Sequence, residues 1–455
     1  MKKKKIIFEI FLLFSLFCFR PLSFSYPTIL SDNIISEEYE FFNLKTSNGS
    51  PNVTIYVNST IFDNINNSVQ QFAQDIIQQG YNVTIVNWSN SDVNFLKANI
   101  SNYYNYGLEG VILIGELPYA IARYFDNGWG VYREFPTDLF LMDLDGLWQD
   151  TIVPNGRYDI DHTNGIIEHT NGTGDWEPEI WIGRISPYSM GMPGINYTQE
   201  LIDYFDRNHD YRTGVISRPH KACLYIDDDW STYASEWISN FTAYTGSELD
   251  TYYINSLTTS TDYMQKLNTT TYEFVHLLAH SWPTYHTFGP LGNGADGITT
   301  YQDIWGNNTL PFFLNLYACF SCDFATKNNT GTYYLFSNDT LVVIGSARSG
   351  GLDLYQPFYD NLGQNVTIGK SFNNWFYNPE IENWAKTELY YGMTIFGDPL
   401  LTILMNDQDK NEPRNGNEIP QGIPGPDMLI IGILSLIVIS MMTRNIEKNL
   451  KFKRE

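Results

Sequence analysis

A histidine and a cysteine each follow a run of apolar residues in the C-terminal half of the sequence. The run from Phe274 to Ala279 leads into His280, and the run from Pro311 to Ala318 leads into Cys319. Such runs are typical of buried strands, so both side chains are predicted to lie at the carboxyl ends of strands. If the two strands are neighbours, the thiol and the imidazole emerge together at one edge of a sheet, where open α/β folds place their sites.

A thiol and an imidazole in this placement indicate nucleophilic catalysis. A nearby imidazolium lowers the pKa of a thiol, and the imidazole can then protonate a leaving amine. The segment 287–310 is long enough for a parallel crossover, with a short helix predicted over 298–305. The structural alternative is a buried cysteine and a core histidine. Either residue alone would favour that alternative, whereas the paired placement favours catalysis.

Two other chemistries use the same residues. His276 and His280 have the i, i+4 spacing of a zinc-binding helix with His286 as a third ligand, but a leucine replaces the general-base glutamate of that motif and the segment lacks helical amphipathicity. Cys319 and Cys322 form a C-x-x-C pair, yet outside the strand-to-helix context of a thioredoxin-like motif. We interpret Cys322 as a packing residue or as a latch that oxidises with Cys319.

The two motifs together resemble the signature of the caspase and gingipain clan, and most closely the gingipain-like cysteine peptidases. The stretch Ala318–Phe324 resembles the Ala-Cys-x-x-x-Asp-Phe motif of that family, and further family-like pieces are Ile112–Glu116, Glu179–Arg184 and Phe396–Pro399. The resemblance covers about residues 50 to 402. It implies an α/β, caspase/gingipain-like fold of two adjacent α/β subdomains with mainly parallel sheets. It also implies an endopeptidase that forms a thioester on Cys319, with His280 as base and no cofactor in catalysis.

One position departs from the family pattern. The family usually has glycine after the catalytic histidine, and its N–H forms the oxyanion hole with the N–H of the cysteine, whereas this sequence has Ser281. Serine keeps the N–H, so Ser281 and Cys319 are expected to form the hole unless the position needs a positive φ, which costs a non-glycine residue about 1 kcal/mol or more. An inactive surface-binding protein of the same fold is therefore the alternative function.

Acidic residues provide further candidate sites. By resemblance to gingipains that cleave after arginine, Asp175 is expected in the substrate pocket, where a carboxylate would pair with a basic side chain. Asp143, Asp145, Asp159 and Asp161 are spaced like hard-cation ligands, so a structural calcium site and a solvated acidic loop both stay open. The triplet Asp227–Asp229 follows a predicted strand, and a calcium, structural or catalytic role is open there. Ser346 and Arg348 follow another predicted strand and are candidates to line the cleft or to stabilise a loop.

The elements that must position these residues fall into two units. The first subdomain (45–210) has strand-like segments at 53–57, 81–86 and 110–115 with helical segments between them, which predicts a parallel sheet. The second, catalytic subdomain (215–405) begins with a strand at 221–226 and ends near 393–399.

Composition and the chain ends indicate export. The net charge of -24 repels phosphate backbones, so no nucleic-acid partner is expected. Residues 1–25 are predicted to be a signal peptide, 406–427 a polar linker, 428–443 a transmembrane anchor and 444–455 a basic cytoplasmic tail. Asn-x-Ser/Thr triplets between Asn48 and Asn365 agree with an extracellular glycoprotein. The expected partners are protein or peptide substrates and the plasma membrane.

Overall fold

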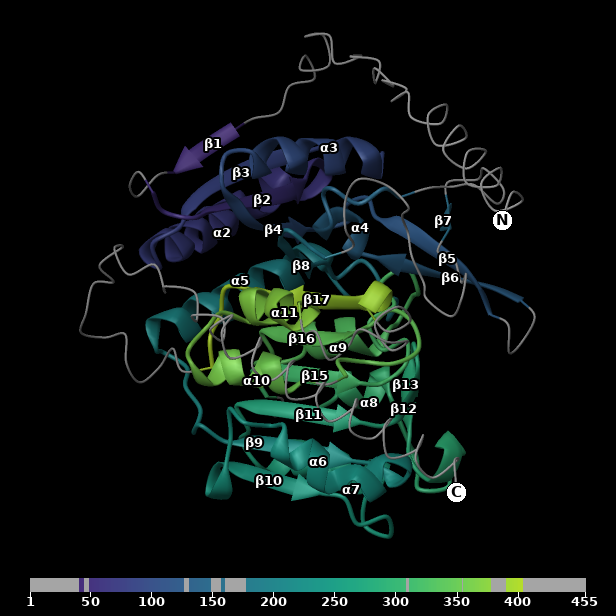
Figure 1. Ribbon diagram of the computed structural model, residues 1–455. Helices are drawn as coiled ribbons and strands as arrows, with labels where there is room; N and C mark the ends of the chain where they lie inside the picture. The colour runs from purple at the N-terminus through teal and green to yellow at the C-terminus, as the bar shows by residue number, and fades with distance from the viewer. Residues whose placement is uncertain are drawn as a thin grey trace, which may run out of the picture. The chain divides into compact units, whose positions relative to one another are not determined.

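The computed structural model describes residues 41–44, 49–126, 131–148, 157–159, 177–307, 311–353, 355–377 and 390–403. These residues belong to one compact unit that begins at Phe41. Its centre is an 11-stranded sheet with the order β1-β3-β2-β4-β8-β17-β16-β15-β11-β9-β10 (Figure 1). The predicted α/β fold with a mainly parallel sheet is confirmed.

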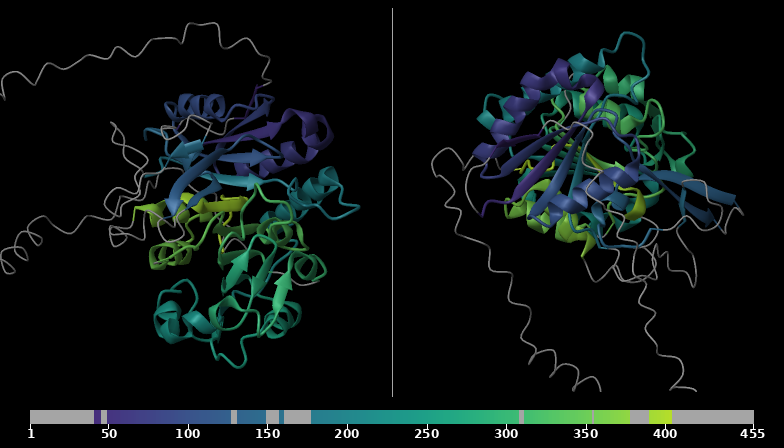
Figure 2. Two further views of the ribbon diagram at one scale, coloured as in Figure 1. Left: turned by 90° about the vertical axis from the view of Figure 1, so that its right-hand side faces the viewer. Right: turned by 90° about the horizontal axis from the view of Figure 1, so that it is seen from above.

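The first half of the sheet consists of four parallel strands and one antiparallel edge strand. The parallel strands are β2 (Asn52–Asn58), β3 (Asn82–Trp88), β4 (Leu108–Ile114) and β8 (Trp181–Ile185), and the edge strand is β1 (Phe41–Leu44). The chain moves outward from β2 to β3 and back to β4. Right-handed crossovers therefore place α2 (Ser59–Gln78) and α3 (Val93–Tyr104) on opposite faces of the sheet (Figure 2).

The second half of the sheet contains the two apolar runs that precede His280 and Cys319. Its parallel strands are β9 (Ala222–Ile226), β10 (Leu249–Tyr252), β11 (Phe274–Leu278), β15 (Phe313–Tyr317) and β16 (Val342–Ser346). Helices on both faces bury these strands, which explains their near-continuous apolar sequences. The helices are α6 (Ala234–Ser239), α7 (Ser260–Thr269), α9 (Thr330–Phe336), α10 (Gln356–Gly363) and α11 (Ile368–Phe376), while α5 (Tyr197–Thr213) connects the two halves.

Strand β17 (Met393–Gly397) joins the two halves. It lies between β8 and β16, parallel to the first and antiparallel to the second. The two halves of the sheet therefore run in opposite directions. Because Met393 pairs with Ser346 and Ile395 with Gly183, the beginning of β8 lies at the same edge as the carboxyl end of β16.

Two small sheets flank this edge. One contains β12 (His280–Trp282), β13 (Tyr285–Thr287) and β14 (Ile298–Thr300), and α8 (Tyr301–Trp305) follows it. The predicted helix over 298–305 thus begins at Tyr301, because Thr300 and Asp303 form a capping box there. The other small sheet contains β5 (Ala120–Asp126), β6 (Val131–Thr137) and β7 (Arg157–Asp159), and α4 (Leu139–Met142) follows β6.

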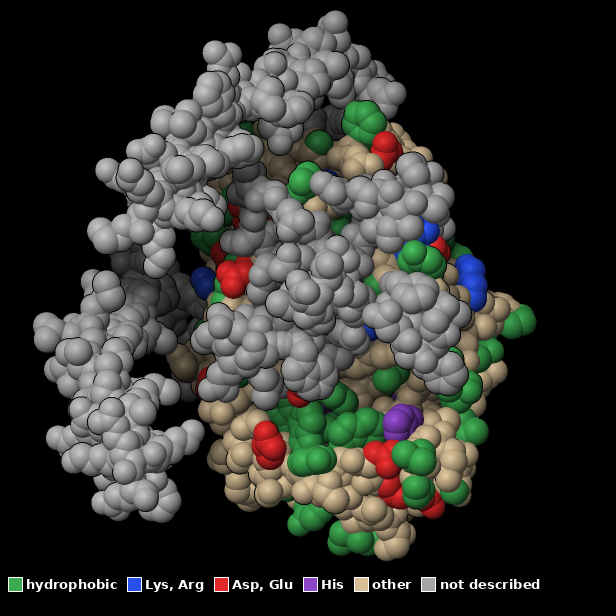
Figure 3. All heavy atoms as spheres, turned by 45° about the vertical axis from the view of Figure 1, so that its right-hand side comes forward, with side chains coloured by type: hydrophobic (Ala, Val, Ile, Leu, Met, Phe, Trp, Pro, Cys, Tyr) green, Lys and Arg blue, Asp and Glu red, His purple; other side chains and the backbone are tan. Residues whose placement is uncertain are grey.

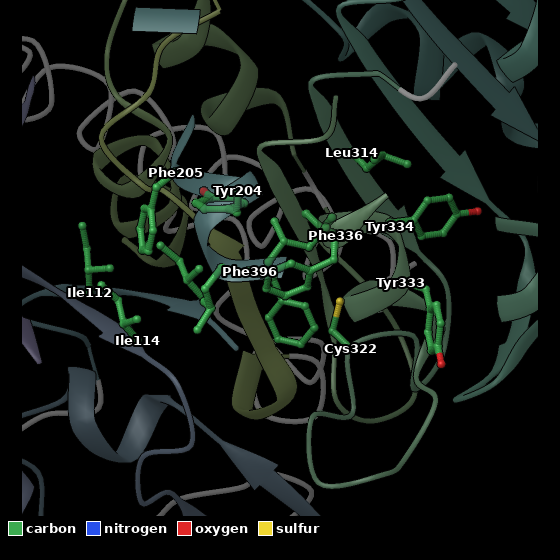
Figure 4. Close-up of a cluster of buried hydrophobic side chains, with 14 of the residues drawn as sticks. Ile112, Ile114, Tyr204, Phe205, Leu314, Cys322, Tyr333, Tyr334, Phe336 and Phe396 are labelled. Atoms are coloured by element: carbon green, nitrogen blue, oxygen red, sulfur yellow. The ribbon is translucent and has the colours of Figure 1, made fainter. Parts of the chain in front are cut away.

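The core includes Cys322. Its side chain has no exposed surface and lies in a cluster with Phe336 and Phe396 (Figure 4). A Cβ atom at Gly331 or Gly345 would come within 2.5 or 2.6 Å of the Cys322 sulfur, so both glycines are needed to make room for it. The structure thus gives Cys322 the packing role and leaves it as a free thiol.

The predicted signal peptide, linker, membrane anchor and basic tail lie outside the described residues. Among the helices of the described ranges, none combines the length and the apolar character that a membrane span requires.

Candidate active site

His280 and Cys319 occupy equivalent positions on neighbouring strands. Strands β11 and β15 pair in parallel, with Leu278 opposite Tyr317. His280 and Cys319 each lie two residues beyond this pair, and adjacent strands are about 4.8 Å apart. The prediction that the two strands are neighbours is confirmed, and both residues lie at the carboxyl edge of the second half of the sheet.

The imidazole of His280 contacts a carboxylate from the segment that follows β9. Its Nε2 atom lies 2.7 Å from Oδ2 of Asp229, which follows β9, and 35% of its side chain is exposed. The Trp230 ring packs against the imidazole with 4.7 Å between ring centroids. Within the described part of the chain, Nδ1 has no hydrogen-bond partner. The imidazole is thus oriented by Asp229 and has one nitrogen available for proton transfer. Figure 3 shows a histidine at the surface beside acidic and hydrophobic side chains.

The thiol of Cys319 is partly buried, and its pKa is raised above the ordinary value of a cysteine. Burial raises the pKa of Cys319, while the N–H groups of Gly350 and of Cys319 itself and the charge of Arg348 act in the opposite direction. The Gly350 N–H donates to Sγ at 3.3 Å. Among the described residues, no hydrogen bond joins Sγ to His280. Activation of the thiol by the imidazolium therefore stays a prediction, and in this structure Asp229 engages the imidazole while burial favours the neutral thiol.

The residue after Cys319 has a strained backbone. Phe320 has a φ of 59°, which is costly for a bulky side chain. Its N–H donates to the carbonyl oxygen of Arg348 at 2.7 Å, and its ring lies nearly parallel to that of Trp282, with 6.1 Å between centroids. These contacts hold the sharp turn that carries Cys319.

Ser281 adopts ordinary strand geometry. It lies in β12 and is absent from the described non-glycine residues with positive φ, so serine is unstrained here. Its hydroxyl lies 3.0 Å from the carbonyl oxygen of Trp282 and 3.1 Å from that of Tyr285, and Nδ1 of His286 lies 3.1 Å from the same hydroxyl. The serine side chain therefore connects the two strands of the hairpin.

His276 and His286 are core residues. Both have no exposed surface, and burial lowers the pKa of each imidazole to about 3, so both are neutral. The Nδ1 atom of His276 lies 3.1 Å from the Tyr359 hydroxyl. The residues His276 and His280 belong to extended segments and not to one helix, so the zinc-helix alternative lacks its scaffold.

A cavity of about 320 Å³ is lined in part by Phe320, the residue that follows Cys319. Its walls include Phe320, Trp282 and the side chains of Tyr124 and Phe135 from the β5–β6 hairpin. The guanidinium of Arg348 lies over the Tyr124 ring at 4.4 Å and donates to its hydroxyl at 3.0 Å. Arg348 thus lines this cavity, whereas Ser346 has no exposed surface and its hydroxyl accepts the Arg348 N–H at 3.2 Å, which stabilises the loop.

An acidic cluster lies near the beginning of β8. Asp143, Asp145 and Glu179 place one carboxylate oxygen each within 4.8 Å of one another, and they are the group in the described ranges where three potential metal ligands meet. Oxygen donors of this kind fit calcium. Burial raises the pKa of Glu179 to about 7, with a further contribution from the two aspartates, and the Lys97 ammonium donates to the Asp143 carbonyl at 2.6 Å. Of the other predicted acidic residues, Asp161, Asp175 and the side chain of Asp159 lie outside the described residues.

Sequence reasoning missed two of these contributions, Glu179 two residues before β8 and Gly350 four residues after β16. For Asp229, the sequence leaves a calcium, a structural and a catalytic role open. All three residues lie close to the end of a strand. That position predicts the edge of the sheet at which a residue lies, but not the side chains that it contacts.

Comparison with known proteins decides the family. The model of peptidase family C25 matches residues 24–404. This chain belongs to peptidase family C25. C25 members are cysteine peptidases, so the conclusion agrees with the predicted gingipain-like resemblance. A solved structure titled "Structure of Protease" shares the fold, with 15% sequence identity, a TM-score of 0.54, and coverage of 78% of this chain and 79% of that chain. No curated protein matches the sequence.

Proposed function

We propose that this C25 chain is an extracellular cysteine endopeptidase in which Cys319 is the nucleophile and His280 is the general base. The observation that carries the proposal is the equivalent placement of the two residues beyond the paired ends of β11 and β15. Asp229 orients the imidazole through Nε2, so Nδ1 is assigned the proton transfer.

The reaction proceeds in two halves. Nδ1 of His280 takes the thiol proton as Sγ attacks the carbonyl carbon of the scissile bond, and the N–H groups of Ser281 and Cys319 stabilise the oxyanion. The imidazolium then protonates the leaving amine, which leaves a thioester on Cys319. Water, deprotonated by His280, attacks the thioester, and the acid product and the free thiol are released. No cofactor takes part.

The proposal includes the chain ends and a structural ion. An N-terminal signal and a C-terminal anchor at 428–443 would place the peptidase outside the plasma membrane; deleting 428–455 should then release it from the membrane fraction.

We assign any structural calcium to Asp143, Asp145 and Glu179, with Asp159 and Asp161 as further ligands, and the donor type supports this assignment.

Labelling by an electrophilic peptide probe tests the mechanism. Wild-type protein should bind the probe covalently and hydrolyse peptides, whereas Cys319→Ala and His280→Ala should lose both properties while keeping the thermal unfolding midpoint. Cys322→Ala is the matched control, because its thiol is buried away from solvent, and it should label as wild type does. If the folded wild-type protein neither labels nor hydrolyses, the inactive surface-binding alternative replaces the peptidase.

A further inference from the structure

Asp227 is a buried carboxyl group near the candidate site to which the proposed reaction gives no role. It directly follows β9 and has no exposed surface. Its N–H donates to the carbonyl oxygen of Leu278 at 2.9 Å, two residues before His280. Its Oδ2 accepts the N–H of Gly289 at 3.1 Å, and its Oδ1 has no hydrogen-bond partner among the described residues. A buried carboxyl with an unused acceptor is costly, so its presence needs an explanation.

The segment Gly289–Gly294, here called the histidine loop, packs against His280. A Cβ atom at Gly292 would lie 2.7 Å from Cβ and Cγ of His280, so the loop backbone contacts the imidazole side chain directly. The N–H of Leu291 donates at 2.8 Å to the same Asp229 oxygen that contacts the imidazole. The loop therefore contacts both His280 and Asp229.

The conformation of the histidine loop depends on hydrogen bonds. Leu291 has a φ of 56° although it is not glycine, and its side chain is 86% exposed, so burial of that side chain does not offset the backbone strain. The N–H of Gly292 donates to the carbonyl oxygen of Gly289 at 3.0 Å. A continuous set of contacts thus leads from Asp227 through Gly289 and Gly292 to the His280 ring.

We propose that Asp227 is a positioning residue, which fixes the histidine loop through Gly289 and thereby holds the His280 imidazole and the Asp229 carboxylate in the reactive orientation. This inference rests on the proposed peptidase function. Burial raises the pKa of Asp227 to about 7, against the effect of the Asp228 and Gly289 N–H groups and together with the charges of Asp228 and Asp229. Burial of the Asp227 carboxyl group is therefore energetically unfavourable, which agrees with a role in positioning neighbouring groups.

Two substitutions in the full chain test the role. Asp227→Ala removes the acceptor of the Gly289 N–H, and kcat should fall roughly 10- to 100-fold while KM changes less than about threefold, because a misplaced catalytic group slows the chemical step. Asp227→Asn keeps an acceptor of the same size, and kcat should return to within about threefold of wild type. Hydrogen exchange over 289–294 should accelerate in the alanine variant and remain slow in the asparagine variant.

Asp228→Asn is the matched control. Asp228 is the adjacent carboxyl, is 9% exposed and also has a carboxylate oxygen without a partner among the described residues, but it makes no bond to the histidine loop. Its substitution should change neither kcat nor loop exchange. A wild-type kcat in Asp227→Ala, or an asparagine variant as slow as the alanine variant with a protected loop, overturns the inference.

A second variant covers the case in which Asp227→Ala does not fold. Gly292→Ala introduces the clashing Cβ from the loop side and should also lower kcat more than it changes KM; a wild-type kcat in this variant shows that the loop does not position the imidazole. Absence of hydrolysis in wild type, or full activity in Cys319→Ala, contradicts the peptidase function itself, whereas an active wild type with an unaffected Asp227→Ala contradicts only this inference.

Discussion

Gly350 donates its backbone N–H to the sulfur atom of Cys319 at 3.3 Å. The same segment begins at Arg348, whose carbonyl oxygen accepts the Phe320 N–H and whose charge favours the thiolate. The chain that follows β16 therefore both positions the nucleophile and counters the effect of burial on its pKa.

Replacing Arg348 by methionine should slow the reaction of the thiol. Loss of the guanidinium raises the pKa of Cys319 further, so iodoacetamide alkylation at pH 8 should be roughly threefold or more slower. Alkylation rates measured against pH report the shift, and Arg348→Lys should stay close to wild type. Equal rates in all three proteins would mean that the guanidinium does not influence the thiol.

Replacing Asp229 by asparagine should lower kcat by about 100-fold. The carboxylate orients His280 and stabilises the imidazolium that forms during proton transfer, and an amide does this poorly. Steady-state kinetics and thermal unfolding check the result. As control, Asp303→Asn weakens the cap of α8 and should cost about 1 kcal/mol of stability with kcat unchanged. An unchanged kcat in Asp229→Asn would remove Asp229 from the mechanism.

Replacing Ser281 by glycine should destabilise the protein without activating it. Ser281→Gly removes the hydroxyl that lies beside two carbonyl oxygens and His286, so the free energy of unfolding should fall by about 1–3 kcal/mol. Denaturant unfolding measures this loss. Because the backbone at 281 has no positive φ, kcat should not rise. A large increase in kcat would show that the serine impairs the oxyanion hole.

Glu179 should make stability depend on pH. Its pKa is raised to about 7 in the folded state, above the usual carboxyl value, so the folded protein retains a proton that the unfolded chain has released. Stability should therefore fall as pH rises from about 4.5 to about 7, by of order 1 kcal/mol because the group is partly exposed.

Glu179→Gln should remove this slope and be the more stable protein above pH 7. Chemical denaturation at pH 5 and pH 8 checks both statements. Calcium chloride should stabilise wild type at pH 8 more than the glutamine variant, if the acidic cluster binds the ion as proposed. A parallel pH dependence in both proteins would exclude Glu179 as its origin.

The preference for the residue before the scissile bond is predicted to depend on Asp175. Wild type should prefer peptides with Arg or Lys before the scissile bond over Leu, and Asp175→Asn should reduce kcat/KM for the basic substrates roughly 10- to 100-fold with the leucine substrate unaffected. Strand β8, which follows Asp175 in the sequence, begins at the edge where β15 ends, which supports this prediction. Absence of a basic preference in wild type removes Asp175 as the specificity residue.

The sequence predicted those features that depend only on a single strand and on the residue that follows it. Apolar runs that end in His280 and Cys319 identify buried parallel strands, and parallel strands bring their carboxyl ends to one edge. The contact between Asp229 and His280 spans 51 residues and exists only because β9 lies beside β11, which no local pattern states. The raised pKa of Cys319 and the cluster at Glu179 likewise depend on how distant segments exclude water.

The position of β17 has a consequence for the order of assembly. This last strand of the sheet in sequence lies between β8 and β16, and until it is in place each of those strands has an unpaired edge. The two halves therefore become one sheet only after residue 397 has been made, through contacts that are distant in sequence and slow to form. During synthesis, Cys319 thus belongs to a half of the sheet that is still open, and completion of the sheet comes last.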